Sequence, residues 1–215
     1  MTVTISRLYN SYPEAEQAIR RLEAAGVSHN DISVIASNAD NWYSEDGIAR
    51  DRNGRPETIV DRDLYGRDDR AEAAGTGAGL GATAGGVAGL LAGLGIIAIP
   101  GVGPVVAAGW LVATLAGAAT GAAAGGILGA LSQAGVSRED AEVYAEGLRR
   151  GGAVVSARVN DADASRLRAI LDQSSVNVGE RGEAYRQGGW RSFDPKAPPY
   201  TTEQARRERE LYTRR

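Results

Sequence analysis

Hydrophobic and polar positions alternate near the N-terminus and then change to a helical period. The alternation predicts a strand over residues 2–8. Apolar residues spaced three and four apart follow, and they predict a helix with Ser11 as its N-cap and Gly26 as its C-cap. A short apolar run predicts a second strand over residues 32–36. These three elements form one βαβ unit.

A similar pattern returns in the second half of the chain. Residues 137–150 are predicted to be a helix, with acidic residues in the first turn and arginines in the last, an order that suits the helix dipole. A strand over residues 153–159 and a helix over residues 161–171 follow, and Val176 and Val178 indicate a last short strand. The second βαβ unit is therefore preceded by one extra helix.

Two βαβ halves predict an α+β fold, a ferredoxin-like sandwich of a four-stranded antiparallel sheet with helices on one face. We expect a helical hairpin and the extra helix to be inserted between the halves. The predicted divisions are a first half (1–36), a polar connection expected to be disordered (37–72), the apolar hairpin (73–136), the extra helix and second half (137–180), and an aromatic and Arg/Glu-rich tail (181–215). The tail aromatics are expected to pack back on the domain, and partner binding is the alternative.

The central stretch, residues 73–137, contains no charged residue. Small residues recur in it at every fourth position, which places them on one face of a helix and lets a second backbone approach closely. They are Gly77, Gly81, Gly85, Gly89, Gly93, Gly109, Ala113, Gly117, Gly121, Gly125 and Gly129. Between the two runs, Pro100, Gly101, Gly103 and Pro104 mark a turn. The pattern predicts two long helices folded back on each other as a glycine zipper.

One short pattern occurs twice, as AGVS-x-x-D at residues 25–31 and again at residues 134–140. Both copies follow a predicted helix. We interpret the repeat as a reused helix-ending turn, and an internal duplication is the less favoured alternative.

Composition limits the classes of function. The 215-residue chain carries a net charge of −3, which argues against electrostatic binding of nucleic acid, and it has no cysteine for disulfides, thiol chemistry or Cys-ligated zinc. The first residues lack the basic and apolar regions of a signal peptide. We therefore expect both termini on the cytoplasmic side.

Motifs for nucleotides, metals and catalysis do not fit. The glycine run at residues 75–81 contains no G-x-G-x-x-G window and follows a charged segment instead of a buried strand. An Asp51-x-Asn53-Gly54 sequence lacks carboxylates at the first and last positions of a calcium loop, and His29 is the only histidine. We expect no cofactor, no metal site and no enzymatic activity.

Four motifs carry a resemblance to a known family. They are residues 99–109 (IPGVGPVVAAG), 123–126 (AAGG), 144–152 (YAEGLRRGG) and 185–190 (YRQGGW) with the following Phe193 and Asp194. In these the chain resembles bacterial general stress proteins, also described as low-temperature-induced or heat-induced stress proteins. The resemblance implies expression under stress, and it implies no reaction and no catalytic residues. The connection at residues 37–72 is longer than is usual in that family.

The uncharged stretch sets the functional hypothesis, because an uncharged helix has no solvent-compatible face and must be covered. We expect a non-enzymatic stress-response protein that associates with a membrane through the hairpin, with a soluble cytoplasmic homo-oligomer as the close alternative. A small-ligand-binding sandwich with the hairpin as a lid is another alternative, and an enzyme using carboxylates of residues 37–72 is a third.

Overall fold

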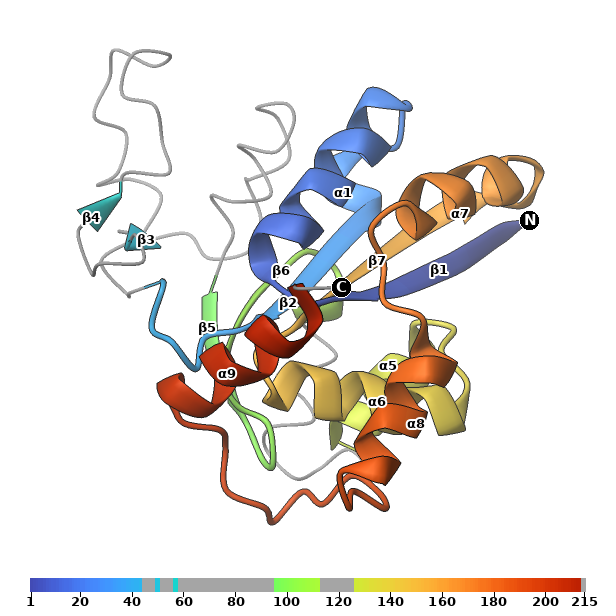
Figure 1. Ribbon diagram of the computed structural model, residues 1–215. Coiled ribbons are helices and arrows are strands. Elements are labelled where there is room, and N and C mark those ends of the chain that lie inside the picture. The colour runs from blue at the N-terminus through green and yellow to red at the C-terminus, as the bar shows by residue number, and fades with distance from the viewer. Residues whose placement is uncertain (44–48, 51–55, 58–94, 113–125, 214–215) are drawn as a thin grey trace.

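The computed structural model describes residues 1–43, 49–50, 56–57, 95–112 and 126–213. Two short pairs of residues, β3 (Ala49–Arg50) and β4 (Pro56–Glu57), form a separate two-stranded ladder. The described residues otherwise form one α+β unit, as the sequence predicts, with the elements arranged as in Figure 1.

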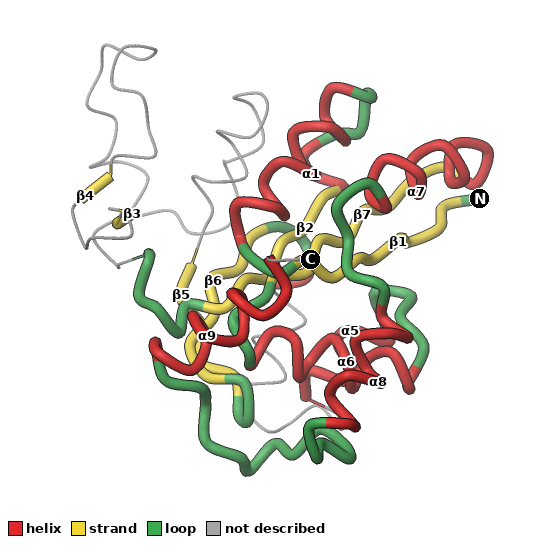
Figure 2. Tube along the Cα trace, in the orientation of Figure 1, coloured by secondary structure: helices red, strands yellow, loops and turns green. Residues whose placement is uncertain are grey.

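Five antiparallel strands form the main sheet: β1 (Thr2–Tyr9), β7 (Ala153–Asn160), β2 (Ile32–Ser37), β6 (Gly103–Ala108) and β5 (Gly95–Ile99), in that spatial order. Strand β7 lies between β1 and β2, with Ala157 opposite both Ile5 of β1 and Ile32 of β2. The N-terminal strand therefore enters the sheet only through a partner far along the chain. Figure 2 shows the strands side by side.

One face of the sheet is covered by α1 (Tyr12–Ala24) and α7 (Ala164–Asp172), and α7 follows the short 3₁₀ turn η2 (Asp161–Asp163). Residues Ile5, Val34 and Val155 point to this side and pack with Ile19 of α1 and Leu167 of α7. Their burial supplies the hydrophobic driving force for docking both helices.

The opposite face is covered by α5 (Gly126–Gln133) and α6 (Arg138–Arg149), so the expectation of helices on one face only is wrong. The serines on this face are buried and hydrogen-bonded. The Ser6 hydroxyl lies 2.8 Å from both the Ala134 carbonyl and the Ser156 hydroxyl, and Ser33 accepts from the Leu111 amide at 3.0 Å. Satisfied hydroxyls can be buried at little cost.

The prediction of helical arms is wrong for residues 95–99 and 103–108, which form the strands β5 and β6. These residues form a β-hairpin whose second strand pairs with β2, Ile35 facing Ala107. β-Branched residues at 96, 97, 99, 102, 105 and 106 favour strands. The edge of β2 supplies a hydrogen-bonding partner for β6. Hydrophobic periodicity within the stretch itself carries no information about this partner. Residues 126–133 are helical, as predicted for the second arm.

The predicted last strand at Val176 and Val178 is also wrong. Val176 donates one backbone hydrogen bond to Leu8 of β1, at 2.7 Å, and the chain then enters α8 (Val178–Gln187). Asn177 caps this helix by accepting from the Glu180 amide at 3.2 Å. An N-cap with a glutamate three residues later favours a helix start over continued pairing.

The repeated AGVS-x-x-D pattern forms the same helix-ending turn in both places. Gly26 and Gly135 have positive φ values of 92° and 77°. In each turn the following valine amide reaches back five residues, from Val27 to Leu22 and from Val136 to Leu131. This is the Schellman arrangement, in which a glycine takes the left-handed conformation. After the first turn comes the 3₁₀ turn η1 (His29–Asp31), which contains the single histidine.

The C-terminal tail returns over the domain and ends in α9 (Thr202–Thr213). The prediction that its aromatic residues pack back on the domain is confirmed. Tyr185 and Phe193 are buried, Trp190 meets the Tyr185 ring edge-on at 5.9 Å, and Tyr200 lies under Arg149.

Candidate functional site

Most of the predicted glycine-zipper positions lie outside the described residues. These are Gly77, Gly81, Gly85, Gly89, Gly93, Ala113, Gly117, Gly121 and Gly125. Gly129 lies within α5, as the prediction requires. Gly109 does not lie in a helix, because it ends β6 with a φ of +89°. A Cβ there would lie 2.3 Å from the Ile32 carbonyl oxygen, so this glycine permits close contact with β2 instead of with a second helix.

The predicted turn at Pro100, Gly101, Gly103 and Pro104 joins β5 to β6 and therefore connects two strands, not two helices. Gly101 and Gly103 have positive φ values of 76° and 104°. A Cβ on Gly101 would lie 2.5 Å from Cα of Pro195. The turn glycines therefore allow the C-terminal tail to dock.

Two of the motifs that carry the family resemblance, at residues 144–152 and 185–190, meet at the C-terminal end of α6. Glu146 is fully buried and meets two arginines one turn further along the helix. Its carboxylate accepts from Arg149 at 2.7 and 2.9 Å and from Arg150 at 2.6 Å. Arg150 also donates to Glu208 of α9 at 2.8 Å. We call these four residues the arginine–glutamate cluster.

The aromatic ring of Tyr185, from α8, completes the cluster. The Arg150 guanidinium lies 4.1 Å from the centre of this ring, a cation–π contact. Burial alone would lower the pKa of Arg150, but the hydrogen bonds to Glu208 and Glu146 raise it well above its usual range. Burial raises the pKa of the Tyr185 hydroxyl, and the charge of Arg181 offsets this only in part. Arg150 thus stays charged and joins three helices.

Helix α9 is held mainly by polar contacts. Arg209 pairs with Asp40 at 2.5 Å, and Tyr212 lies under the Arg181 guanidinium, 3.5 Å from the ring centre. Thr202 donates to the Ala39 carbonyl at 2.7 Å. Ala205 is the fully buried side chain of this helix and rests on Gly151. Electrostatic contacts therefore account for much of the attachment of α9.

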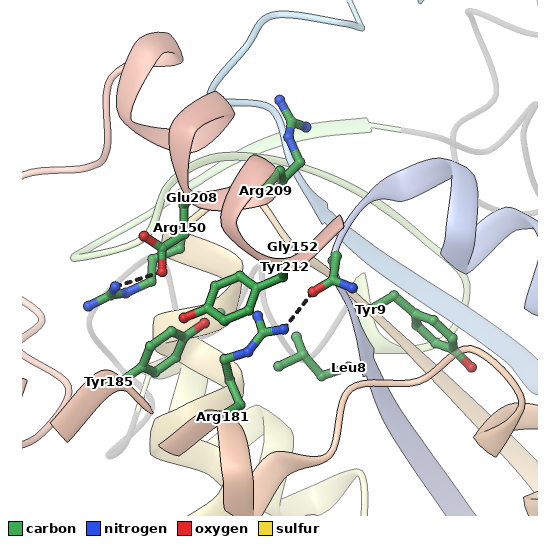
Figure 3. A pocket seen from close by; sticks show the side chains of 11 residues that line it. Leu8, Tyr9, Arg150, Gly152, Arg181, Tyr185, Glu208, Arg209 and Tyr212 are labelled. Atoms are coloured by element: carbon green, nitrogen blue, oxygen red, sulfur yellow. Dashed lines mark hydrogen bonds and ion pairs between the residues drawn. The ribbon is translucent and has the colours of Figure 1, made fainter. Parts of the chain in front are cut away.

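A small cavity lies beneath α9, and Figure 3 shows the side chains around it. Its volume is about 10 Å³, which is room for about one water molecule. Its lining residues come from β1, α6, α8 and α9, from Asn10 just after β1, and from Arg150 and Gly152 in the turn between α6 and β7. They are Leu8, Tyr9, Asn10, Gly147, Arg150, Gly152, Arg181, Tyr185, Glu208, Arg209 and Tyr212. The cavity is too small for a metabolite, so the ligand-binding alternative gains no support from it.

Sequence reasoning identified the 144–152 motif only through its resemblance. The local signal was visible, because Glu146, Arg149 and Arg150 have the spacing of neighbours on a helix surface. Their connection to Tyr185 and Glu208 depends on the fold. Within the described ranges, no three His, Asp or Glu side chains gather in a way that would hold a metal ion, and no helix combines the length and apolar character needed to cross a bilayer.

Comparisons of the chain with protein-family models, with curated proteins and with solved structures found no match. The resemblance to general stress proteins therefore remains a hypothesis based on the four motifs.

Proposed function

We propose that this protein acts without catalysis of its own, as an α+β unit that anchors an uncharged glycine- and alanine-rich segment for association with a membrane. The proposal is based on the observation that parts of the uncharged stretch are buried in the core of the domain. These parts are core elements: Val105, Val106 and Leu111 around β6 and Ile127 and Leu131 in α5 are all buried. A segment tied into the sheet at these points is firmly attached to the domain.

The remaining parts of the stretch are residues 73–94 and 113–125, and their sequence is equally free of charge. Lipid or a second protein surface can cover such sequence without leaving charged groups buried. We propose that these parts form glycine-zipper helices, with α5 as the folded end of the second arm. Self-association into a cytoplasmic oligomer is the alternative use of the same surface.

The proposal for the fold is a ferredoxin-like relative without its last strand. Strand β7 lies between β1 and β2, and helices α1 and α7 follow β1 and β7 onto the same face, which is the split βαβ arrangement. Val176 makes one backbone hydrogen bond to β1, at the edge where we propose that a further strand pairs in such a fold. The resemblance adds the hypothesis that the protein is made during stress.

Fractionation of cells containing the native full-length protein tests the function. We expect the protein in the membrane pellet and expect it to resist carbonate extraction. Recovery in the supernatant as a multimer by sedimentation would favour self-association. A soluble monomer would contradict both forms of the proposal.

A matched deletion identifies the responsible segment. No described strand of the main sheet includes any of residues 74–93, so their removal should leave β5, β6 and α5 in place. We expect the shortened protein to keep the circular dichroism of the folded domain and to lose membrane binding. Unchanged membrane binding would mean that the first arm has no part in it.

A further inference from the structure

The network of charged groups around α9 is unbalanced. Glu146, Glu208 and Asp40 supply three carboxylates, and Arg149, Arg150, Arg181 and Arg209 supply four guanidinium groups. Among the described residues, Arg181 is the member of this network that pairs with no carboxylate. Its guanidinium donates to the neutral Asn10 side chain, with 2.7 Å between nitrogen and oxygen, and lies over the Tyr212 ring. One positive charge is therefore left uncompensated in a partly buried place.

A buried hydroxyl group lies beside this charge. Tyr185 is 1% exposed, and among the described residues no group accepts the proton of its hydroxyl, because the neighbouring Arg181 guanidinium can only donate a hydrogen bond to it. Buried polar groups are nearly always hydrogen-bonded, and one that is left unpaired costs roughly 1–3 kcal/mol. A ligand that accepts a hydrogen bond would remove this cost.

Both groups line the same cavity. Figure 3 shows the hydroxyl ends of Tyr185 and Tyr212 turned toward the side where Arg150 meets Glu208, with Arg181 alongside. The cavity's volume of about 10 Å³ limits an occupant to a single atom or a molecule about as large as water.

We propose that this cavity binds one small monovalent anion of about the size of chloride, held by the Arg181 guanidinium and the Tyr185 hydroxyl. The anion accepts a hydrogen bond from each group and compensates the unpaired charge of Arg181.

The polarity of the lining favours an anion over a cation or a neutral water. Glu208 is the carboxylate in the lining, and its charge is engaged by Arg150 at 2.8 Å. Arg150, Arg181 and Arg209 also line the cavity. A cation would meet three guanidinium groups at short range, and a water would leave the charge of Arg181 uncompensated.

Thermal unfolding of the full-length protein in sodium chloride and in sodium gluconate of equal ionic strength tests the proposal. Gluconate is too large for the cavity, and both salts screen the surface ion pairs equally. We expect Tm to be higher in chloride by about 2–4 °C once chloride exceeds its dissociation constant roughly fivefold.

Three variants make the test specific. Tyr185→Phe removes only the hydroxyl, and Arg181→Gln removes the charge, so both should lose the difference in Tm between chloride and gluconate. Arg166→Gln, which breaks an exposed pair with Asp163 on α7, should keep it. An equal Tm in the two salts for the wild-type protein would overturn the proposal and leave water as the occupant. A difference that Tyr185→Phe retains in full would overturn it as well.

A direct readout is available from crystals soaked in sodium bromide, because bromide scatters anomalously. We expect a single anomalous peak within hydrogen-bonding distance of the Tyr185 hydroxyl and the Arg181 guanidinium. A cavity without such a peak in crystals that show bromide elsewhere would contradict the assignment.

Discussion

Replacing Glu146 with glutamine should destabilise the protein more than any other single change of charge in the cluster. The substitution keeps the shape of the side chain and one acceptor oxygen, but it removes the charge that faces Arg149 and Arg150. Glu146 is 0% exposed, and the side chains of the two arginines are each 15% exposed, so water replaces the lost carboxylate poorly.

The expected magnitude follows from these contacts. Breaking a buried ion pair by removing one partner costs roughly 3–5 kcal/mol. The partial exposure of the arginines and the remaining pair between Arg150 and Glu208 place this case at the lower end, about 3 kcal/mol. For a protein of this size, that corresponds to a Tm lower by about 6–12 °C.

Urea unfolding followed by far-ultraviolet circular dichroism measures the effect. The matched control is Glu16→Gln on α1, where the paired Arg20 side chain is 63% exposed. An exposed pair four residues apart on a helix contributes at most about 0.5 kcal/mol. If Glu146→Gln changes the free energy of unfolding by less than about 1 kcal/mol, the cluster is not a structural centre and the reasoning fails.

Three further predictions concern the core, the turn and the buried tyrosines. Deleting residues 74–134 removes β5, β6 and α5, so circular dichroism should show an unfolded protein, whereas a folded product would mean that the sheet does not need them. Gly101→Ala places a Cβ 2.5 Å from Cα of Pro195, at a residue with positive φ. This variant should have a lower Tm, and its C-terminal tail should become sensitive to limited proteolysis. In the control Gly26→Ala the new Cβ meets no atom within 4 Å, so the tail should stay protected. Burial raises the pKa of Tyr144 to about 12. In the unfolded chain the pKa of a tyrosine is about 10, so the contribution of the buried Tyr144 to stability is fully present below pH 10 and is lost as the pH rises to 12. We expect the absorbance of tyrosinate to rise together with unfolding. Ionisation of Tyr144 near pH 10 in the folded protein would contradict this prediction.

The sequence predicts correctly those strands and helices in which buried residues recur at the regular spacing of that one element. Strands β1, β2 and β7 and helices α1, α6 and α7 belong to this group. The hairpin of β5 and β6 does not, because glycine and alanine at every fourth position suggested a helix while the isoleucines and valines between them suited a strand. The edge of β2 decided the outcome, and that edge is remote in sequence.

The candidate site shows the same division between local and remote information. The spacing of Glu146, Arg149 and Arg150 along α6 is readable from the sequence. Their contact with Tyr185 and Glu208 requires the path of the tail, which depends on the glycines of the β5–β6 turn. The cavity and the unpaired Arg181 exist only where four elements meet, and no motif in the sequence marks them.

The position of β7 between β1 and β2 has a consequence for synthesis on the ribosome. Thr2 pairs with Asn160, so β1 has no partner in the sheet until nearly three quarters of the chain has been made. Translation adds about 5–20 residues per second, so the whole uncharged stretch, which ends at residue 137, is made about 1–5 s before Asn160 completes β7. During that interval the nascent chain presents bare apolar sequence to whatever is near the ribosome. The order of synthesis thus gives a membrane or a chaperone access to this stretch before β7 and β1 complete the sheet.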